Sequence, residues 1–439
     1  MQQGMGDIVL EVAVQEEACR AERHAATERF EAVRHETESL TANLTAEDQS
    51  IQSMPDVSPT KWHLGHTTWF FETFLLARFD PDYRVFDPVF GYLFNSYYEA
   101  VGPRHPRPER GLLSRPTVDI VMAYRDHVGS AVARLIERAA EPEWGEIATL
   151  LELGIHHEQQ HQELILMDIK HVFSLNPLLP AYQAPQLQVQ AAAHPVSWVD
   201  FDGGLKEIGH SGSGFAFDNE SPRHKIWLEP FRLAARPVTC GEYLGFIEEA
   251  GYSRPEFWLS DGWATVREQG WEAPLYWLRE GEEWSVFTLS GRRLLNPAEP
   301  VCHLSFYEAD AFTRWVGKRL PTEAEWETAA EDVPISGNFT DRGHFHPCAD
   351  VSSDAIPQLR QMYGDVWEWT ASPYAAYPRF RPAEGAIGEY NGKFMCNQIV
   401  LRGGSAITPT GHIRATYRNF FPPSARWAFA GLRLAEDIG

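Results

Sequence analysis

A pair of histidines, His157 and His161, constrains this chain more than any other feature. They lie in the polar stretch 156–163, which has a helical pattern. Positions four apart leave an α-helix on the same face, one turn apart, so both imidazoles can reach one metal ion. A catalytic metal needs a third donor, and His66, within an aromatic helix, is the candidate, with His63 as its competitor. Three histidines on one side of a metal would leave positions open for substrate and for oxygen or water.

Three neighbours on the same helix have different expected roles. His156 points about 100° away from His157, so we expect it to pack or to form hydrogen bonds. Glu163 lies two residues beyond His161, and its direction favours a supporting role over direct ligation. Gln160 lies three residues after His157 and is a candidate for a hydrogen bond to substrate or water beside the metal. An ordinary surface glutamine is the alternative.

The length of 439 residues predicts two domains, because single cores stop growing below this size. Helical spacing predicts four helices: residues 8–40, a helix capped by Ser58, residues 117–139 and residues 143–173. An inward-facing metal site is common in such bundles. The sequence therefore predicts an α+β protein with a four-helix bundle over residues 1–180, a linker over 181–195 and a domain of short strands over 196–439.

Composition excludes several classes of function. A net charge of −23 without a basic cluster argues against nucleic acid or an anionic membrane as partner. Five scattered cysteines without a CxxC pair favour a reducing compartment and give no thiolate zinc site. No apolar stretch approaches the length needed to cross a bilayer. We expect a soluble, cytoplasmic protein, with its oligomeric state open.

Several phrases carry a resemblance to known families. The C-terminal half resembles the formylglycine-generating-enzyme/sulfatase-modifying-factor fold, a C-type-lectin-like domain. The phrases are RPVT at 236–239, RLPTEAEWE at 319–327, GDVWEWT at 364–370, LRGGS at 401–405 and AGLR at 430–433. The N-terminal half resembles the DinB-like bundle, whose metal motif is an early histidine plus H-x3-H-x-E. His66, His157, His161 and Glu163 match that motif.

The two domains in this order resemble the ergothioneine-biosynthesis sulfoxide synthases, over residues 28–434. These non-haem iron enzymes are related to the ovothiol-type 5-histidylcysteine sulfoxide synthases. The resemblance implies iron(II), dioxygen, a thiol such as cysteine or γ-glutamylcysteine, and N-α-trimethylhistidine (hercynine). The implied product is a sulfoxide with a new carbon–sulfur bond on the imidazole ring.

Substrate-facing residues follow from this resemblance. Tyr97 and Tyr98 are candidate proton donors, because a phenol beside iron can deliver a proton; the alternative is a pair of aromatics that wedges a loop onto the bundle. A guanidinium can hold the carboxylate of the thiol with two hydrogen bonds. Arg104, Arg107 and Arg110 are the candidates, and a solvated basic loop is the alternative.

The family places a substrate-contacting loop at residues 417–423. Asn419 is a candidate for a hydrogen bond to the imidazole or carboxylate, and aromatic rings nearby can enclose a trimethylammonium group through cation–π contacts. Core packing is the alternative for these rings. The candidates in this region are Arg418, Asn419, Phe420, Phe421 and Trp427.

The sequence is also compatible with other functions. One is copper-type oxidation of a protein cysteine to formylglycine, although Cys348 and Cys396 do not reproduce the cysteine pattern of that chemistry. Others are the ovothiol-type reaction on plain histidine and a zinc-dependent thiol transferase. The last alternative is a protein that only binds a ligand, because a lectin-like fold does not determine a function.

Overall fold

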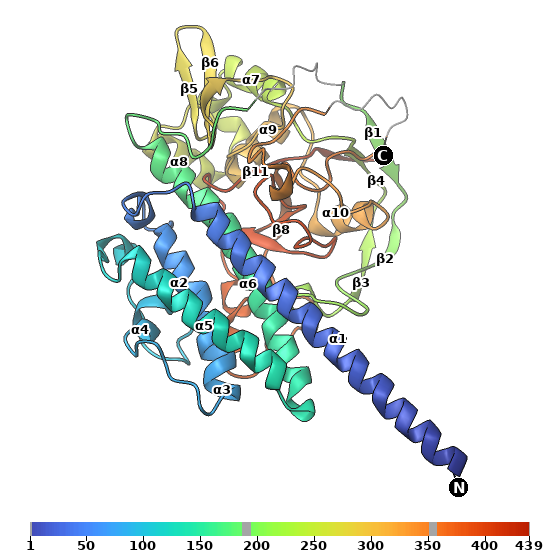
Figure 1. The fold of residues 1–439 in the computed structure, drawn as a ribbon. Helices are drawn as coiled ribbons and strands as arrows, with labels where there is room; N and C mark the ends of the chain where they lie inside the picture. Colours follow the sequence, from blue (N-terminus) through green and yellow to red (C-terminus); the bar gives the residue numbers. More distant parts are fainter. Residues whose placement is uncertain (1, 187–194, 351–357, 439) are drawn as a thin grey trace. The chain divides into compact units, whose positions relative to one another are not determined.

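The computed structural model describes residues 2–186, 195–350 and 358–438 (Figure 1). The chain divides into two compact units, residues 1–165 and 166–439. The division falls inside a long helix, α6 (Glu141–Ser174). The predicted linker over 181–195 lies partly outside the described residues. In its described part, the backbone N–H groups of Tyr182 and Gln183 donate hydrogen bonds to the carbonyl of Leu289.

The first unit contains the four predicted long helices. They are α1 (Gln2–Thr41), α2 (Thr60–Phe71), α5 (Val118–Arg138) and the N-terminal part of α6. A π-helical turn (Glu72–Leu76) and α3 (Ala77–Phe79) continue α2. The helical spacing of the sequence therefore predicted these helices, although α1 begins six residues before the predicted start.

The start of α2 differs from the prediction. Pro59, not Ser58, occupies the cap position, and no side chain caps the helix there. The carbonyl of Pro59 accepts the first helical hydrogen bond from Trp62 N, at 2.8 Å. Ser58 Oγ instead accepts a hydrogen bond from Arg110 Nη1 at 2.9 Å. Ser58 thus ties the following loop to α2.

Residues 80–115, for which the helical spacing predicted no helix, contain two short helices. These are α4 (Phe90–Phe94) and a 3-10 helix (Arg107–Leu112). Trp62 Nε1 on α2 donates to the carbonyl of Leu93 at 3.0 Å, which fixes the end of α4 against the bundle. The sequence missed α4 because its five residues are too short for a helical period.

A buried ion network joins the helices of the first unit. Glu158 on α6 accepts from Arg34 on α1 at 3.0 Å and from Arg125 on α5 at 2.8 Å. Arg125 Nη1 also donates to the carbonyl of Leu64 on α2 at 3.3 Å. All three charged side chains are almost fully buried. The network therefore sets how α2 and α6 are rotated toward each other.

In its described residues, the second unit is built from short strands in four small sheets. The orders are β1-β4-β12, β10-β9-β8-β11, β2-β3 and β5-β6-β7, and the pairing is antiparallel except between β8 and β11. The strands are β1 (Trp198–Phe201), β2 (Gly204–Ile208), β3 (His224–Leu228), β4 (Phe231–Ala234), β5 (Trp277–Glu280), β6 (Glu283–Thr288), β7 (Gly291–Leu294), β8 (Trp367–Pro373), β9 (Ile399–Arg402), β10 (Asn419–Phe421), β11 (Ala430–Gly431) and β12 (Ala435–Asp437).

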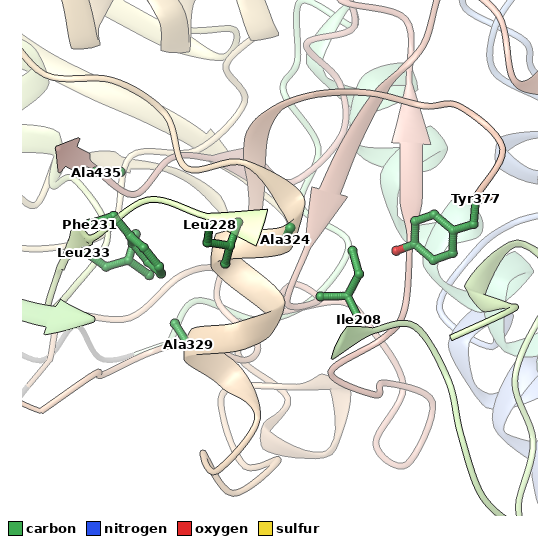
Figure 2. Packing of buried hydrophobic residues seen from close by; sticks show 8 residues of the cluster. All are labelled: Ile208, Leu228, Phe231, Leu233, Ala324, Ala329, Tyr377 and Ala435. Atoms are coloured by element: carbon green, nitrogen blue, oxygen red, sulfur yellow. The ribbon is translucent and has the colours of Figure 1, made fainter. Parts of the chain in front are cut away.

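Four helices of the second unit accompany these strands: α7 (Cys240–Glu248), α8 (Ser260–Gln269), α9 (Phe306–Trp315) and α10 (Glu323–Ala330). Helix α8 and strands β5 to β7 lie in a tryptophan-rich segment whose fold the sequence did not reveal. Figure 2 shows one apolar cluster of this unit, in which Ala324 and Ala329 of α10 pack with Phe231 and Leu233 of β4.

Three of the sequence phrases that carried the family resemblance meet in the core of the second unit. Arg433 donates to both oxygens of Glu368, with a shortest distance of 2.7 Å. Trp326 Nε1 donates to the same carboxylate at 2.7 Å. All three residues are fully buried, so the charged pair and the indole bond hold three distant segments together. These residues are part of the fold.

In the part of the chain that the structure describes, none of the helices is long and apolar enough to span a membrane.

Candidate metal centre

Three buried histidines of the first unit face one another. His66 comes from α2, and His157 and His161 come from α6; one nitrogen of each lies within 4.8 Å of the others. Nε2 of His66 is 3.2 Å from Nε2 of His157. Two nitrogens bound to one ion at about 2.1 Å lie roughly 3 Å apart, so this spacing fits a shared metal. These are the three histidines that the sequence indicates as candidate metal ligands.

Burial makes these imidazoles neutral. It lowers the pKa of His66 and of His161 well below the usual range, and the neighbouring histidines lower both further. Burial lowers the pKa of His157 to about 3. At neutral pH all three therefore offer lone pairs to a cation, which metal binding requires. Three neutral donors leave the full charge of a divalent ion available to further ligands.

This burial predicts a pH dependence for the metal-free protein. Below pH about 6.5 the unfolded chain takes up protons that the folded histidines bind only at much lower pH. The free energy of unfolding should therefore fall as the pH drops from about 6.5 toward 3, by up to about 1.4 kcal/mol per pH unit for each histidine. Urea denaturation in chelator at pH 7, 6 and 5 checks this. In His157→Asn, the free energy of unfolding should fall less steeply with decreasing pH. An unchanged dependence on pH would show that burial of His157 does not contribute to it.

Neighbouring groups fix the ring of His66. Its Nδ1 lies 2.6 Å from the carbonyl of Phe94 and donates to it, which leaves the lone pair on Nε2. The ring stacks between Trp62, with centroids 4.7 Å apart, and Trp69, at 5.6 Å. Trp62 lies four residues before His66, so helical spacing could have revealed this stack. The Phe94 carbonyl has no sequence signal, because any residue offers one.

Two further histidines of these helices, His63 and His156, lie outside the group of three. His63 does not belong to the group of three, and its Nδ1 lies 2.8 Å from Nδ1 of His161. His156 contacts Arg29 at 2.9 Å, which agrees with its predicted hydrogen-bonding role. Glu163 is buried and also lies outside the group.

The candidate proton donors differ in exposure. Tyr98 is fully buried and packs against Trp69, with ring centroids 5.6 Å apart, and against Phe74 at 5.2 Å. Tyr97 is half-buried and stacks on Tyr98 at 4.6 Å. Trp69 touches both His66 and Tyr98, so the tyrosine pair lies one aromatic ring away from the histidines. Gln160 on α6 is half-buried.

The three loop arginines lie in different environments. Arg104 pairs with Glu99 at 2.9 Å, and Arg107 donates to the carbonyl of Asp56. Arg110 is buried, and its guanidinium lies 3.3 Å from the centre of the Trp62 ring that stacks on His66. The structure thus brings Arg110, rather than Arg104 or Arg107, into the surroundings of the histidine group.

The candidates of the second unit also have partners. Arg418 is buried and donates to both oxygens of Glu323, at 2.9 and 3.0 Å. Its guanidinium is therefore bound to a carboxylate of the fold. Asn419 begins β10 and pairs with Leu401, and its Oδ1 accepts from Phe420 N at 2.9 Å.

The three aromatic candidates of this unit are each half-buried. Phe420 stacks on Tyr374, with centroids 4.1 Å apart and planes inclined by 10°. Phe421 and Trp427 meet edge to face at 5.7 Å. Rings packed in pairs with part of their surface open can still contact a ligand. The predicted cation–π role therefore stays a prediction.

Both units match known families. Residues 29–165 match the DinB superfamily, and residues 184–438 match the sulfatase-modifying factor enzyme 1-like domain. The predicted α+β architecture of a helical DinB domain and a sheet-rich second domain is confirmed.

Relatives extend the similarity to nearly the whole chain. The chain is 31% identical to a hercynine oxygenase of Mycolicibacterium thermoresistibile, over 88% of each protein. It is 32% identical to a hercynine oxygenase of Mycobacterium tuberculosis, over 88% of this chain and 92% of that protein. Ergothioneine biosynthesis protein 1 of Schizosaccharomyces pombe is 28% identical over 51% of this chain and 28% of its own length.

Proposed function

We infer the activity of this chain from its family, because it belongs to the hercynine oxygenases. We propose that it joins hercynine to a thiol, cysteine or γ-glutamylcysteine, with dioxygen as oxidant. The thiol loses its hydrogen, the imidazole ring loses the hydrogen of the attacked carbon, and a carbon–sulfur bond forms. One oxygen atom enters the sulfoxide and the other leaves as water. The buried group of three histidines carries this proposal.

We propose iron(II) as the metal, held by His66, His157 and His161. Iron(II) there would supply the redox chemistry with dioxygen and would favour the thiolate form of the thiol. The three imidazoles stay neutral because they are buried, and they hold their nitrogens at the spacing a shared ion needs. An ion with three protein ligands would keep further coordination positions for other ligands.

We assign substrate-facing roles to residues of each unit. Gln160 lies on α6 close to the ligands and can bond a substrate or water. Arg110 contributes positive charge beside the histidines, while Arg104 and Arg107 lie on the same loop for the carboxylate of the thiol. In the second unit, Asn419 and the half-buried rings of Phe420, Phe421 and Trp427 would receive hercynine, and Arg418 would hold β10 in place through Glu323.

The proposed activity is tested with the full chain loaded with iron(II) without oxygen. Hercynine plus cysteine, hercynine plus γ-glutamylcysteine, and histidine plus cysteine are then mixed with oxygenated buffer. We expect oxygen consumption and a sulfoxide, identified by its mass, with hercynine and one thiol. Product from plain histidine would instead indicate the ovothiol-type reaction. Oxygen-independent turnover with zinc would indicate a thiol transferase and would contradict the proposal.

Tyr97 is our preferred proton donor, because it is half-buried whereas Tyr98 is enclosed by aromatic rings. Tyr97→Phe should lower sulfoxide formation by about 10²–10⁴-fold, the usual contribution of a general acid. Thiol oxidation to the sulfinic acid should then take over, most fully in the double variant with Tyr98→Phe. Product ratios by mass analysis check this. Tyr92→Phe, an exposed tyrosine of α4, is the matched control, and full sulfoxide yield in the double variant would exclude the role.

A further inference from the structure

His63 lies beside the proposed metal centre without belonging to its group of three histidines. It stands three residues before His66 on α2, so the two imidazoles leave neighbouring positions on one face of the helix. His63 is 2% exposed, and its Nδ1 lies 2.8 Å from Nδ1 of His161 on α6. We propose that His63 is a positioning residue that fixes the tautomer and ring orientation of His161, so that His161 presents Nε2 to the metal. The proposal rests on the metal centre proposed above.

The contact restricts which nitrogen of each ring carries the proton. A neutral imidazole has one N–H and one bare nitrogen, so two Nδ1 atoms in contact need one donor and one acceptor. If His63 donated, His161 would carry its proton on Nε2, which could not then bind a metal. If His161 donates, its Nε2 keeps a lone pair and His63 carries its proton on Nε2. Metal binding therefore selects the arrangement in which His161 donates to His63.

His66 shows the same arrangement with a different acceptor. Its Nδ1 lies 2.6 Å from the carbonyl of Phe94, which can only accept. His66 therefore carries its proton on Nδ1 and its lone pair on Nε2, the atom that faces Nε2 of His157. A main-chain carbonyl orients one ligand, and the side chain of His63 orients another. Because His63 and His161 are both buried, water is poorly placed to take over as the acceptor.

A side-chain acceptor can be removed by substitution, which a main-chain carbonyl does not allow. His63→Leu removes the acceptor, and His63→Asn keeps an acceptor oxygen near the position of Nδ1. Loss of an outer partner of a metal-bound histidine typically weakens metal binding by about 10–100-fold. We therefore expect His63→Leu to weaken Fe(II) and Co(II) binding by that factor and to shift the visible bands of the Co(II)-loaded protein. His63→Asn should restore most of the affinity and the wild-type spectrum.

Control variants separate this role from a general loss of structure. His156→Leu removes a buried histidine that bonds to Arg29, and it should keep the wild-type metal affinity and Co(II) spectrum. Unfolding of each metal-free variant, followed by circular dichroism, shows whether the fold is intact. A wild-type protein that binds no metal, or binding that survives His157→Ala, would remove the metal centre itself.

Two results would overturn the role of His63 while leaving the metal centre in place. One is equal metal affinity in wild type and His63→Leu. The other is an equal loss in His63→Asn and His63→Leu, which would make His63 a fourth ligand. If His63→Leu fails to fold, long-range ¹H–¹⁵N spectra of the Zn(II)-loaded wild type decide the question. They should show His63 protonated on Nε2 and His161 on Nδ1, and the opposite pattern contradicts the proposal.

Discussion

His157→Ala should abolish the oxygen-dependent reaction and weaken metal binding by more than 100-fold. Removing a residue that only supports a metal ligand weakens metal binding by up to about 100-fold. His157 is proposed to bind the metal directly, so its removal should have a larger effect. Its nitrogen lies 3.2 Å from that of His66, so its loss removes one of three donors. Metal affinity by competition with a chelator, and oxygen uptake with hercynine and thiol, measure the two effects.

The adjacent histidine supplies the control for this substitution. His156 is also buried on α6, but it bonds to Arg29 and lies outside the group of three. His156→Ala should lower stability and leave metal affinity close to that of the wild type. If the two alanine variants lost metal equally, a general loosening of α6 would explain the effect, and the assignment of His157 as a ligand would fail.

The sequence predicted part of this site from spacing alone. His157 and His161 lie one helical turn apart, and the direction of neighbouring positions follows from the helix. His66 entered through a family resemblance, because nothing local distinguishes it from His63. The structure separates them through contacts between helices: His66 faces Nε2 of His157, whereas His63 faces Nδ1 of His161. Such tertiary contacts are not encoded in a local pattern.

The arginines show a second limit of sequence reasoning. Arg104, Arg107 and Arg110 share a three-residue spacing, yet only Arg110 is buried, over the Trp62 ring. Arg418 looked like a substrate contact because of its position in the family, and it forms a buried pair with Glu323. A guanidinium suits a substrate carboxylate and a protein carboxylate equally well. The presence of an arginine therefore does not show whether it binds a substrate or a carboxylate of the protein until its partner is known.

Removal of Glu158 should destabilise the protein more than any other single change in the helical unit that leaves the ligands intact. Glu158 is fully buried between Arg34 and Arg125, which hold its pKa at about 2 against the effect of burial. Glu158→Ala removes this carboxylate from both guanidinium groups and leaves Arg125 its contact with Glu38 at 3.2 Å; breaking a buried charge pair typically costs about 3–5 kcal/mol. Arg125 also bonds to Leu64 on α2, so the variant should weaken metal binding as well. Urea denaturation and a metal titration measure both effects.

An exposed pair between the same two helices gives the matched comparison. Glu152 on α6 pairs with Arg29 on α1 at 2.6 Å, and both side chains are more than a third exposed. Water already solvates these charges, so Glu152→Ala should cost less than about 1 kcal/mol. The two variants remove the same chemical group from the same helix, and burial is the main difference between them. Equal losses of stability would show that the Glu158 network does not fix α2 against α6, and the buried charges would then need another explanation.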